Sequence, residues 1–405
     1  MQFCCNLTEM STKMKVCGII AEYDPFHKGH AWQIQQAREL SKADYVICVM
    51  SMSFTQRGMP ALLSPHDRAR MALMSGADIV LGVPYAFSVC DAEKFGLGGV
   101  EILRRCGVVS ALSFGVEEAG RDVFLPAAEL LENPTEEYQS LLRKKLDQGM
   151  LYARAQGESL SEVLCVDANI FTLPNTSLAM CYARACLATD AGFEFVPVIR
   201  KGSYHDAQMQ DEELNFSSAS AVRAAVLAGN MDDVKNAMPE DAFSILSEAI
   251  KAGTYQKYQP LESLLRWRLR YDSFKGLPDL SEGIENRFCT AANAQTRDEM
   301  VQLIKTKRYT YARINRLLAH VLSQTDANDI PPKPEYAYLL GFRQRAANVL
   351  HDIGNNALML YHRLPSGDLS PMQALDARAD DLWAIGAQQP FGALHRAKPV
   401  IIKDL

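Results

Sequence analysis

The sequence predicts an α/β fold, with a Rossmann-like parallel-sheet domain followed by a mainly α-helical C-terminal domain. Three observations predict this order. Near-continuous apolar segments alternate with amphipathic ones in the first half, helical patterns dominate beyond about Pro239, and 405 residues are too many for one ordinary core. We expect three parts, namely a disordered leader at 1–14, an α/β domain at 15–240 and a helical domain at 241–405.

The strands of the expected sheet are short apolar segments of the kind buried on both faces. Strands of this type are typical of parallel sheets covered by helices. They lie at 16–21, 45–50, 78–83, 108–114 and 193–199, and the intervening helices at 30–41, 65–74, 92–105, 122–164 (in pieces) and from Thr176. Ligands bind such sheets at the carboxyl ends of the strands, where His27, Gln56 and Gly115 fall.

Composition excludes several classes of protein. No apolar stretch approaches the ~18 residues needed to cross a bilayer, so we expect a cytoplasmic protein without a membrane partner. The first 14 residues lack the apolar core of a secretory signal, and either Met1 or Met14 could be the start. The ten cysteines form no C-x-x-C pair, which favours buried, reduced thiols over a zinc or redox site.

Charge is distributed unevenly along the chain. The net charge is −6, but residues 251–325 carry 13 Lys and Arg against seven Asp and Glu. This local excess of +6 indicates a polyanion-binding segment joined to an acidic body, with a solvated helical face as the alternative.

The segment from Val16 to Ala31, V-C-G-I-I-A-E-Y-D-P-F-H-K-G-H-A, carries the strongest chemical signal. An apolar strand is followed by a proline turn and then by His27-Lys28-Gly29-His30 at the start of a helix. Helix N-termini favour anions, and a cationic or hydrogen-bonding histidine adds to that preference. We therefore expect His27 and His30 to bind phosphates and to stabilise a leaving pyrophosphate. A surface histidine pair, or a zinc pair without partners, is the alternative.

Other segments of the first half offer groups that could complete a nucleotide site. Ser218 begins a helix in which Arg223 follows about one turn later. The serine could cap the helix and donate to a phosphate whose charge Arg223 neutralises. The alternative is an ordinary serine cap with a solvated arginine. Arg200 ends a strand, where its guanidinium could bind a triphosphate or a carboxylate, although a plain surface loop is also open. The Asn175 amide could read an adenine or ribose edge.

Two clusters in the helical half mix cations with aromatic rings, a combination suited to phosphates and exposed bases. Side chains lying along a helix core with buried tyrosines are the alternative. The candidate tRNA-binding residues are Arg266, Arg268, Arg270, Lys305, Lys307, Arg308, Arg313 and Arg316, interleaved with Trp267, Tyr309 and Tyr311.

Several motifs together resemble one family. They are G-I-I-A-E-Y-D-P-F-H-K-G-H at 18–30, M-S-M-S-F-T-Q-R-G at 50–58, S-F-G at 113–115, P-N-T-S-L-A at 174–179, S-Y-H-D at 203–206, I-E-N-R at 284–287 and K-R-Y-T at 307–310. In this order they resemble the bacterial tRNA(Met) cytidine acetate ligases of the nucleotidyltransferase superfamily.

The resemblance implies an ATP site and assigns residues to it. The implied catalytic residues are His27 and His30. The implied ATP-binding residues are Ile20, Ala21, Glu22, Tyr23, Asp24, Pro25, Phe26, His27, Lys28, Gly29, His30, Ala31, Trp32, Gln33, Gly115, Asn175, Arg200 and Lys201, and our reading of the residues adds Ser218 and Arg223. The chain departs from the family in two places. Asp24 stands where the family usually has Asn, and the loop at 200–206 is one residue shorter.

The resemblance also implies an activity. Acetate would be activated by ATP as acetyl-adenylate, and the acetyl group would pass to N4 of the wobble cytidine of elongator tRNA(Met), forming N4-acetylcytidine. Mg²⁺ is expected to accompany ATP, without a dedicated protein metal site. Two other functions stay open at this point: a small-molecule adenylyltransferase of cofactor synthesis, and a non-catalytic tRNA-binding protein with a vestigial nucleotide pocket.

Overall fold

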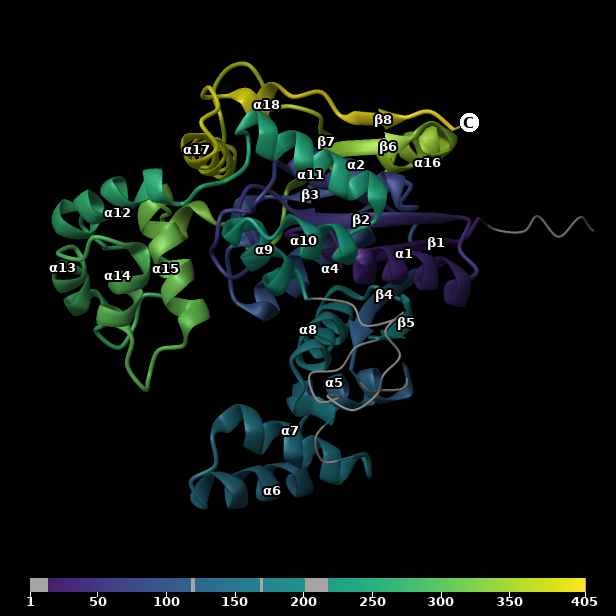
Figure 1. Cartoon of the computed structure of the whole chain (residues 1–405). Helices are drawn as coiled ribbons and strands as arrows, with labels where there is room; N and C mark the ends of the chain where they lie inside the picture. The colour runs from purple at the N-terminus through teal and green to yellow at the C-terminus, as the bar shows by residue number, and fades with distance from the viewer. Residues whose placement is uncertain (1–13, 118–120, 168–169, 201–217, 405) are drawn as a thin grey trace, which may run out of the picture.

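The structure, a computed structural model, describes residues 14–117, 121–167, 170–200 and 218–404. Within these ranges the strands form a single sheet in the order β5-β4-β1-β2-β3-β6-β7, and β8 pairs with the far part of β6 (Figure 1). The strand bounds are β1 Val16–Ala21, β2 Tyr45–Ser51, β3 Ile79–Val83, β4 Ala111–Val116, β5 Glu194–Ile199, β6 Tyr336–Arg343, β7 Met359–Tyr361 and β8 Val400–Ile402. The predicted leader lies outside the described residues, apart from Met14.

The first five strands are all parallel, as their apolar composition predicts. From β1 the chain proceeds to β2 and β3 on one side, whereas β4 and β5 pair on the other side. The order of strands therefore reverses between β1 and β4. A crevice forms at such a reversal, beyond the carboxyl ends of the two strands, and this is where α/β sheets bind ligands.

Helices cover the parallel part of the sheet; α8 packs against α4 and β4, whereas α6 and α7 extend away from the sheet. The helix pair α6–α7 lies farthest from the sheet, below α5 and α8 in Figure 1. The bounds are α1 Lys28–Ser41, α2 Pro65–Met74, α3 Tyr85–Ser88, α4 Ala92–Arg105, α5 Phe124–Glu132, α6 Glu136–Asp147, α7 Tyr152–Val163, α8 Pro174–Thr189, α9 Ala219–Ala228 and α10 Met231–Ala237.

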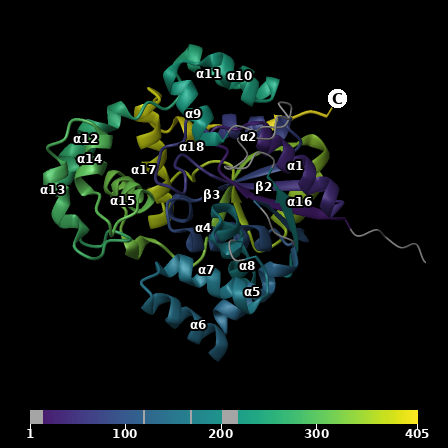
Figure 2. The same ribbon diagram turned by 60° about the horizontal axis from the view of Figure 1, so that its bottom comes forward.

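The C-terminal half is mainly helical, as predicted, but it also contains strands that the sequence analysis missed. Its helices are α11 Glu240–Ala252, α12 Gln259–Tyr271, α13 Phe288–Ala291, α14 Arg297–Ile304, α15 Tyr311–Ser323, α16 Ala347–Gly354, α17 Pro371–Gly386 and α18 Ala393–Arg396. Helices α12–α15 make a lobe beside the sheet (Figures 1 and 2), which we call the helical lobe. Within 241–405, which we expected to be mainly helical, β6, β7 and β8 are strands, and β6 extends the sheet by pairing antiparallel with β3.

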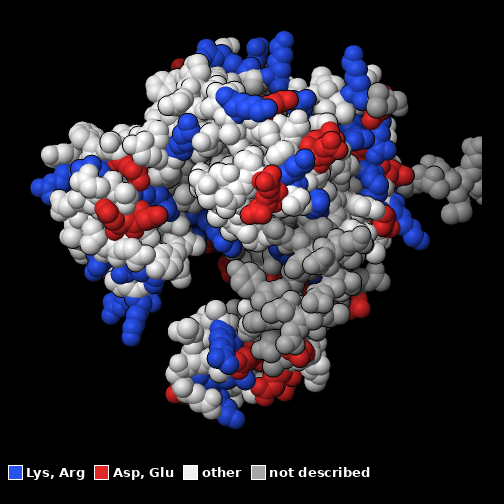
Figure 3. All heavy atoms as spheres, viewed as in Figure 1, with Lys and Arg blue, Asp and Glu red and all other residues white. Residues whose placement is uncertain are grey.

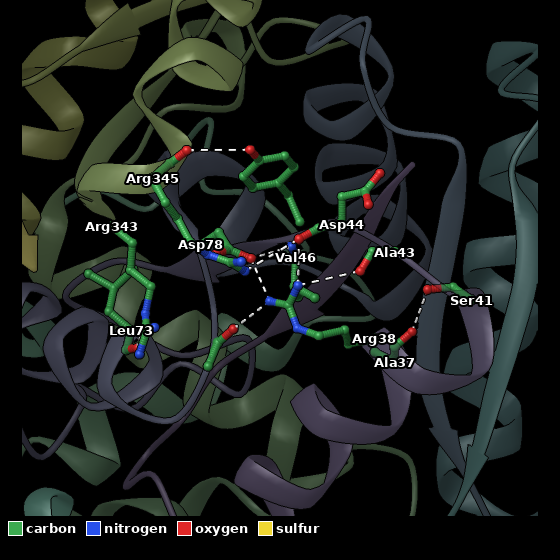
Figure 4. A network of polar contacts seen from close by, with 12 residues as sticks. Ala37, Arg38, Ser41, Ala43, Asp44, Val46, Leu73, Asp78, Arg343 and Arg345 are labelled. Carbon is green, nitrogen blue, oxygen red and sulfur yellow. Dashed lines mark hydrogen bonds and ion pairs between the residues drawn. The ribbon is translucent and has the colours of Figure 1, made fainter. Parts of the chain in front are cut away.

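A buried carboxylate joins this added strand to the parallel sheet. Asp78, fully buried just before β3, accepts hydrogen bonds from Arg38 of α1, from the Val46 amide and from Arg345 after β6 (Figure 4). One carboxylate therefore holds β2, α1 and the C-terminal segment together. Such a group is tolerated in a core because both of its oxygens are paired with cations or amides.

A second buried carboxylate attaches α17. Asp376 accepts hydrogen bonds from the Tyr85 amide at 2.7 Å and from the hydroxyls of Tyr336 and Tyr338 at 2.5 and 2.8 Å. Burial raises the pKa of Asp376 to about 7. Helix α17 and strand β6 thus share buried polar contacts with α3 at the sheet.

Two expectations about composition can be compared with the structure. Of the described cysteines, five are buried as expected, whereas Cys165 and Cys289 are exposed and Cys181 is half-buried; all of them are reduced. Across the described ranges no helix is both long and apolar enough to cross a membrane.

Candidate functional site

The two motif histidines build the N-terminus of α1. His27 is the N-cap residue, and its Nδ1 accepts a hydrogen bond from the Gly29 amide at 3.0 Å. The His27 amide in turn donates to Nδ1 of His30 at 3.3 Å. This is a reciprocal capping box made by two imidazoles, and their rings stack with centroids 3.7 Å apart. The spacing of H-x-G-H follows from this geometry.

Both imidazoles are neutral in this arrangement. Burial, together with the positive charge of Arg200, lowers the pKa of His27 to about 4 and that of His30 well below its usual range. Because each Nδ1 accepts a hydrogen bond, each ring carries its proton on Nε2. The structure therefore favours the hydrogen-bonding alternative over the cationic one: the pair can donate two Nε2–H groups without adding charge.

Buried aromatic rings hold His30 from behind. Tyr23 and Phe26 are both buried, and their ring centroids lie 4.9 and 5.6 Å from that of His30. The turn between β1 and α1 thus contributes to the core, which fixes the orientation of the histidine. Tyr23 and Phe26 of the motif therefore fix the histidine by packing against its ring.

Asp24 and Arg223 form an ion pair that the sequence analysis did not anticipate. The Asp24 Oδ2 lies 2.6 Å from Nη1 of Arg223, and its Oδ1 accepts a hydrogen bond from the Leu62 amide. Arg223 also donates to the Pro60 carbonyl at 3.1 Å. The guanidinium of Arg223, which we expected to neutralise phosphate, is paired with Asp24 in the structure. The same pairing compensates the extra negative charge of Asp24.

Glu22 and Gln56 connect the ends of β1 and β2. The Glu22 carboxylate accepts a hydrogen bond from the Gln56 amide, and Gln56 donates its side-chain amide to the Cys90 carbonyl. Burial raises the pKa of Glu22. These contacts tie the residue after β1 to the loops after β2 and α3.

Arg200 and Gly115 meet on the other side of the crevice. Arg200 leaves the end of β5, where its amide bonds to the Val116 carbonyl, and its side chain crosses Gly115. A Cβ placed on Gly115 would lie 3.6 Å from Cγ of Arg200, which is ordinary contact. The positive charge that lowers the pKa values of both histidines is that of Arg200, so the three side chains share one site.

Asn175, at the start of α8, is linked to Arg200. Its Oδ1 accepts a hydrogen bond from Nη1 of Arg200 at 2.9 Å, and its Nδ2 donates to Glu117 at 2.5 Å. Both ends of the amide are therefore engaged within the protein, whereas the sequence analysis expected this amide to read an adenine or ribose edge. The described site brings His27, His30 and Arg200 together with Asn175.

Glu117 is the residue that sequence reasoning missed. It lies two residues after Gly115 and accepts hydrogen bonds from the backbone and side chain of Asn175 and of Thr176. These contacts lower its pKa despite partial burial, so the carboxylate stays ionised. Its place after a strand end was a sequence signal, but its partners lie 58 residues away.

The remaining predicted site residues lie at the end of β1, in the first turns of α1 and at the start of α9. Ile20 and Ala21 end β1, and Lys28, Ala31, Trp32 and Gln33 belong to the first turns of α1. Ser218 caps α9, accepting a hydrogen bond from the Ala221 amide at 3.2 Å. Lys201 lies outside the described residues.

The basic residues of the helical lobe divide into exposed and internally paired groups. Lys307 and Arg308 are exposed in the loop between α14 and α15, which forms the lower end of the lobe in Figure 1. In Figure 3 basic side chains gather at this end, beside a hollow that separates the lobe from α6 and α7. Lys305 lies over the exposed ring of Tyr311, with Nζ 5.1 Å from the centroid.

Arg313 and Arg316 serve the packing of the lobe itself. Arg313 pairs with Glu282 at 3.2 Å and stacks on Tyr309, whose ring is buried. Arg316 is buried and pairs with Asp279 at 3.3 Å. For these two residues, which we expected to contact tRNA, the structure favours the alternative of side chains packed over the helix core.

The cluster on α12 is mixed in the same way. Arg268 pairs with Asp272 at 3.0 Å and Arg266 donates to Gln295, whereas Arg270 is exposed. Trp267 and the nearby Tyr271 are also exposed, with ring centroids 5.7 Å apart. Exposed aromatic rings beside an exposed cation are a surface on which an unpaired base could stack.

Comparison with known proteins gives a consistent result. The HIGH Nucleotidyl Transferase family model matches residues 14–395. A tRNA(Met) cytidine acetate ligase of Clostridium kluyveri is 33% identical over 97% of this chain and 100% of its own, and one of Fervidobacterium nodosum is 32% identical over 85% and 82%.

Solved structures agree with the sequence relatives. A crystal structure of Thermotoga maritima TmcAL bound with alpha-thio ATP is 27% identical and superimposes with a TM-score of 0.84, covering 96% of this chain and all of the other. An apo form of the same protein gives a TM-score of 0.85. The predicted fold class is thereby confirmed, and the chain belongs to the tRNA(Met) cytidine acetate ligase family of HIGH nucleotidyltransferases.

Proposed function

We propose that this protein is an ATP-dependent ligase that converts acetate to acetyl-adenylate and transfers the acetyl group to N4 of the wobble cytidine of elongator tRNA(Met). The observation that carries the proposal is the neutral His27–His30 pair facing Arg200 at the crevice between β1 and β4. Membership of the family supplies the acceptor and the acyl group. The structural relative bound with alpha-thio ATP supports ATP as the nucleotide.

In the first half-reaction, a carboxylate oxygen of acetate attacks the α-phosphorus of ATP and the bond to the β-phosphate oxygen breaks, releasing pyrophosphate. Negative charge grows on the leaving oxygens. Nε2–H groups of His27 and His30 would donate hydrogen bonds to them, and Arg200 would add positive charge. Donors that are already oriented need no reorganisation during the reaction, so fixed neutral imidazoles suit this role.

In the second half-reaction, the cytidine N4 amine attacks the acetyl carbonyl, the bond to the AMP oxygen breaks, and N4 loses a proton. The wobble base belongs to an anticodon loop, from which an unpaired base can be splayed into a site. The work of the protein in both steps is orientation and electrostatic stabilisation, and neither step requires a covalent protein intermediate.

Mg²⁺ would enter as a companion of the ATP phosphates. Within the ranges that the structure describes, no group of three or more His, Cys, Asp or Glu side chains could hold a metal ion. Asp24, the acidic residue nearest the motif histidines in sequence, is already paired with Arg223.

The helical lobe would supply part of the tRNA-binding surface. Lys307 and Arg308 are exposed, while Arg313 and Arg316 are held by acidic partners. Phosphate contacts of this kind provide affinity and orientation. The exposed Trp267 and Tyr271 could add base stacking.

The test is incubation of the protein with ATP, acetate and elongator tRNA(Met), followed by mass spectrometry of the nucleosides. We expect N4-acetylcytidine, acetate-dependent exchange of pyrophosphate into ATP, and loss of both with His30→Ala. His351→Ala, which removes an exposed histidine of α16, is the matched control and should leave both unchanged. Activity only on a phosphate-ester acceptor would indicate a small-molecule adenylyltransferase, and tRNA binding without exchange would indicate a non-catalytic protein; either result refutes the proposal.

A further inference from the structure

Glu117 collects four hydrogen bonds at the start of α8. Its Oε1 accepts from the backbone amide of Asn175 at 2.9 Å and from Nδ2 of the same residue at 2.5 Å. Its Oε2 accepts from the amide and hydroxyl of Thr176 at 3.0 and 3.2 Å. The first residues of α8 are therefore satisfied by a carboxylate of the protein itself, which takes the place that an external anion would occupy at a helix N-terminus.

The carboxylate also determines which way the Asn175 amide points. A carboxylate only accepts hydrogen bonds, so the Asn175 group next to it must be the NH₂ donor. The opposite end of the amide is then the carbonyl oxygen, which faces Arg200 and accepts from its Nη1 at 2.9 Å. With the amide reversed, two donors would face each other and this hydrogen bond would be lost.

We propose that Glu117 is a positioning residue for ATP binding: through the Asn175 amide it holds the Arg200 guanidinium at the crevice shared with His27 and His30. The long side chain of Arg200 passes over Gly115. Glycine has no side chain, so it does little to restrict the conformation of the arginine. The hydrogen bond to Asn175 is the side-chain contact of Arg200 that limits its rotation among the described residues.

This inference rests on the proposed function, because it assumes that Arg200 binds the ATP phosphates. It adds a residue outside the H-x-G-H segment and a direction of action: from Glu117 to Asn175 to Arg200. A purely structural role, as an N-terminal cap of α8, would be independent of Arg200. The two roles therefore differ in whether the effect of a change at Glu117 requires the arginine.

The test is a double-mutant cycle between Glu117→Gln and Arg200→Ala, with the KM for ATP and the kcat measured in acetate-dependent pyrophosphate exchange. Glutamine keeps the size of the side chain, but its NH₂ group faces the donors of Asn175 and Thr176. This disfavours the native orientation of the Asn175 amide. We expect Glu117→Gln to raise the KM for ATP at least about fivefold, with a smaller change in kcat, because a hydrogen bond to a charged group is lost. In the Arg200→Ala background the same change should alter KM less than about twofold.

Two further variants keep the test decisive. Thr176→Val removes one of the four hydrogen bonds to Glu117 but leaves the Asn175 amide in place, and should leave KM unchanged. Asn175→Ser removes the bridge while keeping the carboxylate and should reproduce the rise in KM, so it replaces Glu117→Gln if that variant does not fold. An equal effect of Glu117→Gln with and without Arg200 overturns the inference, even when the wild-type protein forms N4-acetylcytidine and the proposed function stands.

Discussion

The carboxylate of Asp24 and the guanidinium of Arg223 lie 2.6 Å apart, so that a residue of the turn after β1 is paired with a residue of α9. Both side chains are largely buried, with exposed fractions of 11% and 17%. In sequence the two residues are far apart, and each one separately suggests an effect on ATP phosphates. In the structure their charges compensate each other. Substitution of the two residues should therefore have opposite effects on the KM for ATP.

Removing Arg223 should weaken ATP binding, whereas removing the charge of Asp24 should not. Arg223→Ala leaves an uncompensated negative charge next to the phosphate-binding turn, and we expect the KM for ATP to rise about fivefold, equivalent to about 1 kcal/mol of repulsion. Asp24→Asn leaves a positive charge and keeps the acceptor for the Leu62 amide, so KM should stay equal or fall. Pyrophosphate exchange measures both.

The double variant Asp24→Asn with Arg223→Ala is the control for this pair. It removes both charges, so its KM should return toward that of the wild type. A rise in KM with Asp24→Asn as large as that with Arg223→Ala would show that the pair matters through structure and not through its charges.

Neutral His27 makes the stability of the protein depend on pH. The folded-state pKa of His27 is about 4, below the ~6.5 of an unfolded chain. Between these values the unfolded state binds the extra proton, so this contribution is complete above pH 6.5 and is lost as the pH falls toward 4. The loss reaches up to about 3 kcal/mol in the free energy of unfolding, as measured by urea denaturation at each pH.

His27→Asn isolates this effect, because asparagine can also cap α1 but does not titrate. We expect the variant to lose less stability than the wild type between pH 6.5 and 4. Buried His66 and His320 titrate in both proteins and cancel in the comparison, whereas His27 contributes to the lowered pKa of His30, so the change measured includes that contribution. Identical pH profiles for the two proteins would contradict a neutral His27.

The exposed cations of the α14–α15 loop should govern the salt dependence of tRNA binding. Reversing charge with Lys307→Glu and Arg308→Glu should weaken binding and make the slope of log K against log salt shallower by about 1.5 to 2, since two phosphate contacts are lost. Pyrophosphate exchange, which needs no tRNA, should be unchanged. Filter binding over a range of salt concentrations measures the slope.

The matched control has the same change of charge elsewhere. Lys398→Glu with Lys403→Glu alters two exposed lysines of the C-terminal segment, away from the helical lobe. We expect this control to keep most of the affinity and nearly the same slope. Equal losses in the two double variants would mean that only net charge, and not the loop, matters. Arg313 is unsuitable for this test because its pairing with Glu282 belongs to the packing of the lobe.

The buried Asp78 should be a major source of stability. Asp78→Asn leaves Arg38 and Arg345 without their shared counter-charge, and we expect a loss of about 3 to 5 kcal/mol in the free energy of unfolding. Arg345→Met should cost less, about 1 kcal/mol, because 43% of that side chain is exposed and water can replace part of the pair. Urea denaturation distinguishes the two; an equal, small loss for both would contradict a central role of the carboxylate.

Much of the parallel sheet could be predicted from the sequence. Strands such as β1 and β2 are read correctly because an uninterrupted apolar run has few other folded solutions, and the start of α2 follows from Ser64 and Pro65. The missed strand β6, Tyr-Ala-Tyr-Leu-Leu-Gly-Phe-Arg, lies among helices in sequence, and its partner β3 comes about 260 residues earlier. Periodicity contains no information about a partner so far away.

The functional site also contains features that local sequence encodes and features that only long-range contacts produce. The sequence by itself determined the H-x-G-H turn, since a strand, a proline turn and a helix start are encoded within about 15 consecutive residues. Only the tertiary structure decided that Arg223 belongs to Asp24, that Glu117 orients Asn175, and that the histidines are neutral. Those outcomes depend on which side chains meet across the sheet and on how completely water is excluded around them, and neither quantity is a property of local sequence.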